Sequence, residues 1–202
     1  MKGGIFHATL AVAATMLALP ATAHAHLVNT GLGPFYDGVS HVALTPEDFL
    51  PALALALLAG LGGARAGRLV LFALPVSWLA GGLVGLDVPM SGTAPALTTV
   101  SFLVLGGLVA ADARLRPEWI AGLALVLGAL HGYSNGSAMA EARLGALGLV
   151  GVVSTLFTIV ALAAALVVAL SAPWTRIAVR VAGSWIGAIG LLLLGWTLSG
   201  RA

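Results

Sequence analysis

Residues Leu144–Leu170 read LGALGLVGVVSTLFTIVALAAALVVAL, 27 residues without one charged side chain. A helix of this length is long enough to cross the hydrocarbon core of a bilayer, which takes about 20 apolar residues. The rest of the chain has the same character, because 60% of its 202 residues are hydrophobic, 8% are charged and the mean hydropathy is +1.08. A soluble domain carries about 25% charged residues. The composition therefore predicts a polytopic membrane protein.

The charge balance and the absence of cysteine exclude several classes of function. Nine basic against seven acidic residues leave a net charge of +2, too small for a nucleic-acid-binding surface. With no cysteine in the chain, disulfides, thiolate metal sites, iron–sulfur clusters and cysteine nucleophiles are excluded. Soluble enzymes and disordered proteins are excluded by the scarcity of charge.

The first 25 residues predict a cleaved signal peptide, with a basic start, the apolar run Leu10–Leu19 and small residues at the end. The run is too short to span a bilayer. Cleavage fits after Ala23 or after Ala25, and an uncleaved first helix is the alternative. Cleavage after Ala23 would leave His24 first and His26 third, an arrangement that can bind Cu²⁺ or Ni²⁺ through nitrogen atoms. His26 is therefore a candidate ligand, and a terminus without a metal role is the alternative.

Residues 26–202 predict an all-α bundle of six transmembrane helices joined by short polar turns, with an outer metal-binding segment at 26–48. The predicted spans are Phe49–Gly63, Leu69–Leu86, Thr93–Ala111, Trp119–Gly132, Leu144–Leu170 and Ile177–Leu198. The first and fourth are short for a bilayer, and the fifth is long enough to require tilting. Glycines at 81, 82 and 85, and at 183, 187 and 190, predict seams where helices approach closely.

The arginines predict the orientation of the bundle. Loops one, three and five contain Arg65, Arg68, Arg114, Arg116, Arg176 and Arg180. The other loops and the tail contain only Arg143 and Arg201. Because cytoplasmic loops carry the excess of positive charge, the arginine-rich loops are expected inside and the mature N-terminus outside. We expect a multi-pass protein of the bacterial cytoplasmic (inner) membrane.

One concentration of polar residues precedes the first predicted span. Asp37 and His41 are four residues apart, so on a helix they share a face, and they predict a metal-binding pair at the outer surface. Two solvated side chains are the alternative. Thr45-Pro46 followed by acidic residues is typical of a helix start. Asp48 is interpreted first as a partner of that helix dipole, with a ligand role as the alternative.

A second concentration follows the fourth predicted span and is expected at the same outer face. His131 and Asn135 are four residues apart and can point to one side of the bundle, and Glu141 adds a carboxylate. The alternative is that His131, at the end of an apolar run, is only an interfacial histidine. Aspartate and histidine ligands suit a borderline divalent ion such as Ni²⁺, Co²⁺ or Cu²⁺. So few ligands predict weak, transient binding, as a permeation pathway requires. Hydroxyls inside the spans, Ser101 among them, can line such a path, but more commonly bond their own helix backbone.

At these motifs the sequence resembles the HupE/UreJ family, hydrogenase and urease accessory membrane proteins regarded as nickel or cobalt permeases. The stretches that carry the resemblance are Gly31-Leu-Gly-Pro-Phe-Tyr-Asp37-Gly-Val-Ser-His41, Thr45-Pro-Glu-Asp48 and His131-Gly-Tyr-Ser-Asn-Gly136. The likeness covers essentially the whole mature chain. The family's usual second motif is His-Gly-Tyr-Ala-His-Gly-x-Glu, and here Asn135 stands for the second His and Ala138 for the Glu. The common first motif, an adjacent Asp-His, is also altered.

The sequence thus predicts a permease for a divalent transition-metal ion, nickel or cobalt first, with copper or zinc left open. Asp37, His41 and His131 are expected to capture the ion. The candidate metal ligands are Asp37, His41, His131, Asn135, His26, Asp48 and Glu141. We expect no permanently bound cofactor and no enzymatic activity. The expected partners are the lipid bilayer and the metal ion, with a homo-oligomer left open.

Two alternatives remain at this stage. The first is a non-transporting accessory or metal-sensing scaffold, favoured if Asn135 and Ala138 have disabled permeation. The second is an intramembrane hydrolase, in which His131 activates Ser134 or Ser137, or in which Asp37, His41 and His131 hold a zinc ion.

Overall fold

The computed structural model describes residues 30–88, 95–170 and 172–199, and every regular element in them is a helix. The helices are α2 (Pro34–Leu44), α3 (Pro46–Leu61), α4 (Ala64–Asp87), α5 (Pro95–Ala110), α6 (Pro117–Glu141), α7 (Gly145–Ala169) and α8 (Pro173–Leu198). The predicted all-α class is confirmed. The predicted signal peptide and His26 lie outside the described residues.

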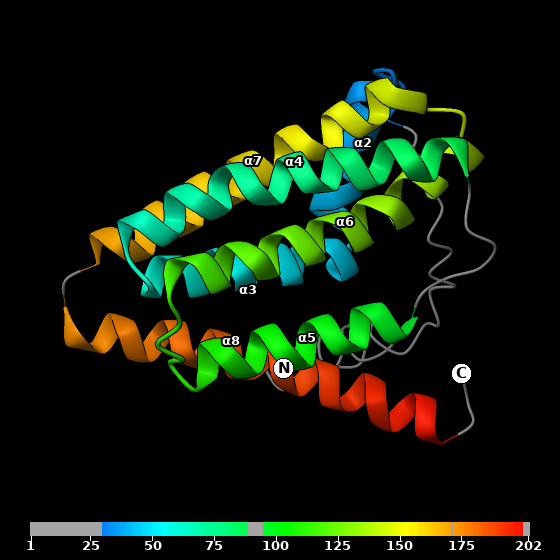
Figure 1. Ribbon diagram of the computed structural model, residues 1–202. Coiled ribbons are helices and arrows are strands. Elements are labelled where there is room, and N and C mark those ends of the chain that lie inside the picture. Colours follow the sequence, from blue (N-terminus) through cyan, green and yellow to red (C-terminus); the bar gives the residue numbers. More distant parts are fainter. Residues whose placement is uncertain (1–29, 89–94, 171, 200–202) are drawn as a thin grey trace, which may run out of the picture.

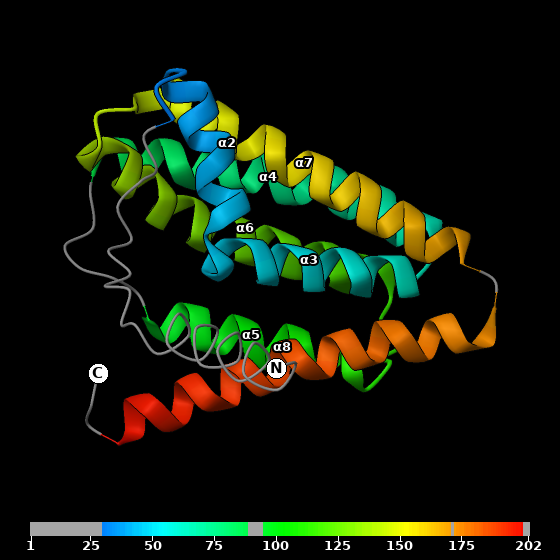
Figure 2. The same ribbon diagram turned by 180° about the vertical axis from the view of Figure 1, so that it is seen from behind.

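The helices form three layers, which can be followed in Figures 1 and 2. α4 and α7 make one outer layer, α3 and α6 lie in the middle, and α5 and α8 make the other outer layer. α2 packs against one end of α7. Fully buried side chains such as Leu55 of α3, Leu74 of α4 and Leu156 of α7 fill the space between the first two layers.

Each predicted span overlaps one helix of α3 to α8, but the fourth prediction ends too early. It stopped at Gly132, where polar residues begin, whereas α6 continues to Glu141. Sequence reasoning read His131 as the end of an apolar run at the membrane surface. In the fold, these polar residues face neighbouring helices, so the helix continues through them. The segment before the first predicted span also forms a helix, α2.

Length and composition identify α4, α7 and residues Trp174–Leu198 of α8 as helices that could each cross a membrane. α2 and α3 qualify together, as a pair bent by 71°, which raises the count to four among the described residues. Residues Ala96–Ala110 of α5 form a shorter apolar helix. The predicted count of six spans is therefore not confirmed, while the apolar helices agree with a multi-pass protein embedded in lipid.

The arginine-rich loops all lie at one end of the bundle, where α3, α5 and α7 finish and α4, α6 and α8 begin (Figure 1). We call this the arginine end. Two ion pairs lie there: Arg65 Nη2 of α4 is 2.7 Å from Glu118 Oε1 of α6, and Arg176 of α8 contacts Asp112 in the turn after α5. The three arginine-rich loops, which the positive-inside rule assigns to one side of the membrane, therefore do lie at the same end of the bundle.

Glycines let α4 and α6 approach more closely than side chains would allow. Gly128, Gly132 and Gly136 lie four residues apart on α6, and each faces backbone atoms of α4. From the other side, Gly81 and Gly85 of α4 face the backbone of α6. The predicted glycine seam of α4 is confirmed, and α6 contributes a matching one.

The second predicted seam lies between α8 and α5. Gly183 lies against Val109 and Ala110, and Gly190 against Leu103. Gly106 of α5 in turn faces the backbone of α8. The small residues at 183, 187 and 190 therefore join α8 to α5, as expected.

Gly132→Ala is expected to destabilise the protein. A methyl group there would collide with the backbone of Trp78, so α4 and α6 would have to separate. Overpacking of this kind costs about 1–3 kcal/mol. Gly122→Ala on the same helix is the matched control, because nothing lies within 4 Å of the added carbon. Thermal unfolding in detergent should show a lower midpoint for the first variant only, and equal midpoints would contradict the seam.

The pair of Asp112 and Arg176 predicts a pH-dependent contribution to stability. Arg176 donates from Nε to Oδ2 at 2.7 Å and from Nη2 to Oδ1 at 2.6 Å. These hydrogen bonds hold the pKa of Asp112 below its ordinary value of 3.8. The stabilisation is therefore fully present above pH 3.8 and is lost as the pH falls through the lower pKa of the folded state.

Asp112→Asn should thus lower the unfolding midpoint at neutral pH, by the equivalent of about 0.2–1 kcal/mol for a partly exposed surface pair. Asparagine tolerates the left-handed backbone at this position, where φ is 54°. The difference from wild type should shrink as the pH is lowered below 3.8. A difference that does not change with pH would contradict this assignment.

Candidate functional site

The bend between α2 and α3 carries Asp48 into the bundle. Thr45 occupies the position before α3, and Pro46 is the first residue of the helix. An N–H at this position has no acceptor within the helix, so proline loses no hydrogen bond there. The predicted helix start is thereby confirmed. Asp48 follows in the first turn, with only 5% of its surface exposed. The Thr45 side chain makes no capping hydrogen bond, and its hydroxyl instead lies 3.5 Å from Nδ1 of His41.

Asp48 is the centre of a cluster that joins three helices. Its Oδ1 lies 3.0 Å from Nδ1 of His131 on α6. Its Oδ2 accepts a hydrogen bond of 2.8 Å from Nδ2 of Asn135, one turn further along α6. Nε2 of His41 on α2 lies 3.4 Å from the same oxygen. Both carboxylate oxygens are therefore occupied by nitrogen atoms from two other helices.

His131 is oriented by partners on both ring nitrogens. A carboxylate only accepts hydrogen bonds, so Nδ1 of His131 carries a proton toward Asp48. Nε2 lies 3.0 Å from the Ser101 hydroxyl of α5. In the neutral ring this nitrogen carries the free lone pair, and the Ser101 hydroxyl donates to it. The chain Ser101–His131–Asp48 thus runs through α5, α6 and α3.

Trp78 of α4 covers one face of the His131 ring. The two ring centroids are 5.4 Å apart and the planes are tilted by 33°. The tryptophan is fully buried and reaches this position because Gly128 and Gly132 bring α6 close to the α4 backbone. The indole therefore limits how far the imidazole can turn.

Two buried polar atoms at this cluster have no hydrogen-bond partner within the described residues: Nε1 of Trp78 and Oδ1 of Asn135. The orientation of the Asn135 amide follows from its neighbour, because the reverse orientation would place two acceptors against each other at Asp48. An acceptor oxygen is thus left free beside a carboxylate. Such unmade bonds in a protein interior are uncommon.

The electrostatics of the cluster centre on one buried carboxylate. Among the described residues, no arginine or lysine bonds to Asp48, and its partners are two imidazoles and one amide. His131 and Asn135 are only 2% and 4% exposed. Burying a carboxylate away from water is expensive unless positive charge or hydrogen bonds compensate it. The imidazoles are therefore the only groups seen here that can bring positive charge to it.

The structure separates Asp37 from the cluster. Asp37 Oδ1 accepts hydrogen bonds from the backbone N–H and the hydroxyl of Thr30, at 2.7 and 2.6 Å. In the part of the chain that the structure describes, no hydrogen bond joins it to His41, although both belong to α2. Asp37 therefore ties down the segment before α2, whereas His41 faces Asp48.

The remaining predicted ligands fall into three groups. His131, Asn135 and Asp48 are brought together with His41. Glu141 is exposed at the last position of α6 and takes no part in the cluster. His26 lies outside the described residues. Within those residues, no group of three or more His, Asp and Glu side chains is arranged around a common point as a preformed metal site.

From the sequence, Ser101 and Trp78 were expected only as side chains that can line a polar path, and not as neighbours of His131. Ser101 was expected more commonly to bond its own helix backbone, but its hydroxyl pairs with His131 of another helix. The available signal was a run of hydroxyl residues in an otherwise apolar helix. That signal does not indicate which neighbour the hydroxyl faces, since this depends on how α5 packs against α6.

Comparison with known proteins identifies the family. No curated protein and no solved structure matches the chain. A family model described as HupE / UreJ protein matches residues 12–193, which is most of the chain and includes α2 to α7 and the whole cluster. This chain therefore belongs to the HupE/UreJ family of metal-related accessory or transport membrane proteins.

Proposed function

We propose that this protein is a permease for a divalent transition-metal ion, with nickel or cobalt as the expected cargo and Asp48 as the central residue of its path. The observation that carries the proposal is the buried carboxylate held between His41 and His131, from two different helices. Ionisable residues inside membrane bundles are rare, and they commonly mark ion paths. Family membership supports the same general role.

The chemistry of the donors favours a transition metal. One carboxylate and two imidazoles suit Ni²⁺, Co²⁺ and Zn²⁺, whereas harder ions such as Mg²⁺ prefer oxygen atoms alone. A divalent ion would also supply positive charge to Asp48, whose partners among the described residues are two imidazoles and one amide. Oδ1 of Asn135 is a further oxygen donor, already buried and without a partner.

The same contacts explain how binding can be reversible. The carboxylate and the His131 imidazole already have internal partners: Asp48 bonds to His131 and Asn135, and Nε2 of His131 pairs with Ser101. An entering ion exchanges these hydrogen bonds for coordination bonds, and they re-form when it leaves. This exchange keeps net binding weak enough for release, as conduction requires.

The depth of the cluster fits a site that ions reach from one surface and leave toward the other. At 1.5 Å per residue, His131 lies about 21 Å along α6 from its first residue, Pro117, and about 15 Å from its last, Glu141. By the positive-inside rule we place the arginine end in the cytoplasm and the mature N-terminus outside, in the bacterial inner membrane. A membrane potential of 100 mV then contributes about 4.6 kcal/mol to uptake of a doubly charged ion.

Asp48→Asn is expected to lower the rate of Ni²⁺ or Co²⁺ uptake into proteoliposomes by more than about tenfold under an imposed potential. Asparagine keeps the volume of the side chain and can still accept from His131, but it removes the charge and one coordinating oxygen. The matched control is Asp37→Asn, because that carboxylate is equally buried at 5% exposed and bonds to Thr30 instead. Uptake by the control should stay near wild type.

Three other results would be informative. Loss of uptake in Asp37→Asn with retention in Asp48→Asn would overturn the central role of Asp48. No uptake of any divalent ion by wild type would favour the non-transporting scaffold. The double variant Asn135→His/Ala138→Glu restores the family's usual motif. If this variant transports an ion that wild type does not, the scaffold alternative is supported further.

A second candidate function, an intramembrane hydrolase, is favoured by one specific contact chain. Ser101 Oγ, the two ring nitrogens of His131 and Asp48 Oδ1 are joined by two contacts of 3.0 Å each. This is the order of groups in a Ser–His–Asp triad, in which the histidine accepts the serine proton. The nucleophile would then be Ser101, rather than the Ser134 or Ser137 expected from sequence.

Ser101→Ala separates the two functions. In a permease, removing the hydroxyl frees the lone pair on Nε2 of His131, so Co²⁺ should bind more tightly. Loss of one competing hydrogen bond of about 1 kcal/mol corresponds to about fivefold in affinity. In a hydrolase, the same variant would abolish covalent labelling by a fluorophosphonate probe.

The two readouts are Co²⁺ titration followed by its visible absorption, and probe labelling of the purified protein. Ser154→Ala serves as control, because that hydroxyl is exposed and bonds to its own helix at Val150. Labelling of wild type that disappears in Ser101→Ala would support the hydrolase and contradict our proposal. Tighter Co²⁺ binding with no labelling of wild type supports the permease.

A further inference from the structure

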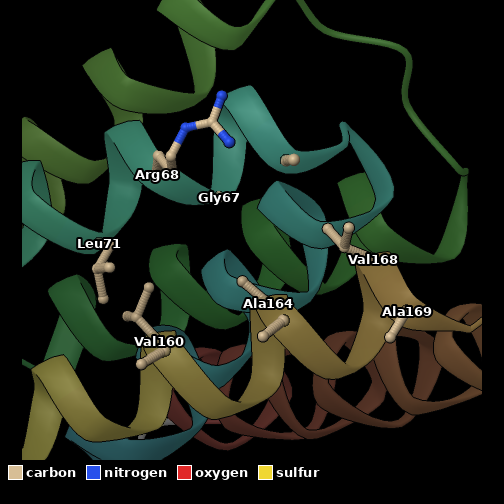
Figure 3. Close-up of a pocket in the computed structure, with 10 residues that line it drawn as sticks. Gly67, Arg68, Leu71, Val160, Ala164, Val168 and Ala169 are labelled. Carbon is tan, nitrogen blue, oxygen red and sulfur yellow. The ribbon is translucent and has the colours of Figure 1, made fainter.

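A groove runs along the surface of the bundle between the first half of α4 and the second half of α7, away from the Asp48 cluster (Figure 3). Its volume is about 280 Å³. One wall is formed by Gly67, Arg68 and Leu71 of α4, and the other by residues such as Val160, Ala164 and Ala165 of α7. It is open to the surroundings of the bundle.

Small side chains on both helices create the groove. On α7 the lining positions recur at the helical period and are alanines and valines. On α4 the glycine at 67 faces Ala164, and a carbon added to it would only just touch that side chain, at 3.5 Å. Apart from Arg68 and Leu71 of α4, the lining residues are glycine, alanine and valine, so the two walls leave apolar space that a flexible chain can fill. Since the groove opens on the surface of the bundle, lipid acyl chains are the apolar groups that can enter it in a bilayer.

The groove extends to about the depth of one membrane leaflet. Its α7 wall runs from Val160 to Ala169, about 14 Å at 1.5 Å per residue. Half of a hydrocarbon core of about 30 Å is about 15 Å. The groove also reaches the arginine end, since its lining includes Ala64 and Ala169, the first residue of α4 and the last of α7. An acyl chain entering from that surface would fit along it.

One basic side chain stands at the rim. Arg68 lies about 6 Å from the start of α4, and its guanidinium points away from the Ala164 wall (Figure 3). Its neighbour Arg65 is engaged by Glu118. Arg68 has no ion pair among the described residues, and no acidic residue lines the groove. The rim therefore carries a free positive charge at the level expected for lipid headgroups.

We propose that this groove binds an anionic phospholipid, with one acyl chain between α4 and α7 and the phosphate paired with Arg68. The apolar walls account for the acyl chain, and the unpaired guanidinium accounts for the preference for a negatively charged headgroup. Arginine suits this role because its fork of N–H donors matches phosphate oxygens. The site is independent of the cation path and does not rely on transport.

The experiment compares two lipids that carry the same acyl chains, phosphatidylglycerol and phosphatidylcholine. Purified full-length protein is incubated with equal amounts of both in detergent, and the lipid retained is measured by native mass spectrometry. Wild type should retain phosphatidylglycerol about fivefold over phosphatidylcholine, the contribution of one basic residue near an anionic headgroup. Arg68→Gln should remove this preference, whereas Arg143→Gln, an exposed arginine beyond the opposite end of α6, should keep it.

A second variant tests the acyl-chain half of the site. Ala165→Leu puts a large side chain into the groove and should reduce retention of both lipids several-fold. Ala188→Leu makes the same change on an exposed face of α8 and should have no effect. Equal retention of the two lipids by wild type would overturn the proposal. So would an unchanged preference in Arg68→Gln, or unchanged retention in Ala165→Leu.

Discussion

The buried carboxylate of Asp48 is the constraint on which the arrangement of the other helices depends. A charged group inside a membrane bundle must be compensated by neighbours, because no water is available to solvate it. Here the compensation comes from three different helices: α2 through His41, α6 through His131 and Asn135, and α5 indirectly through Ser101. Helices that are otherwise held by non-directional apolar packing therefore acquire a specific register relative to one another.

The glycine seam between α4 and α6 makes this arrangement sterically feasible. Gly128, Gly132 and Gly136 carry no side chains that would hold α4 away, so Trp78 reaches the face of the His131 ring. The residues that bring the backbones together thus alternate along α6 with those that carry the polar chemistry. The glycines that pack against α4 and the polar residues of the cluster lie on the same turns of α6. A change to the glycine seam therefore also moves the His131 imidazole.

The two ends of the bundle have different chemistry. The arginine end has surface ion pairs and an apolar groove with Arg68 at its rim, the groove that we propose binds an anionic phospholipid. The Asp48 cluster lies deeper, beside the bend that joins α2 to α3. A bend where two helices meet exposes backbone groups that a straight helix would satisfy, and such breaks in membrane proteins occur where they line a polar site. The polar cluster and the basic surface therefore lie at different levels of the bundle.

The sequence alone determined the membrane class, the all-α fold, the approximate positions of the apolar helices (with the fourth ended too early), the glycine seams of α4 and α8, and the family. These depend on local composition and periodicity, which a single segment displays by itself. It also identified His41, Asp48, His131 and Asn135 as candidates, since polar residues are conspicuous in apolar surroundings. Only the tertiary structure decided that Asp48, rather than Asp37, lies between the two histidines, and that Ser101 and Trp78 complete the cluster. Those contacts depend on how helices rotate and bend against one another, which spacing along one helix does not specify.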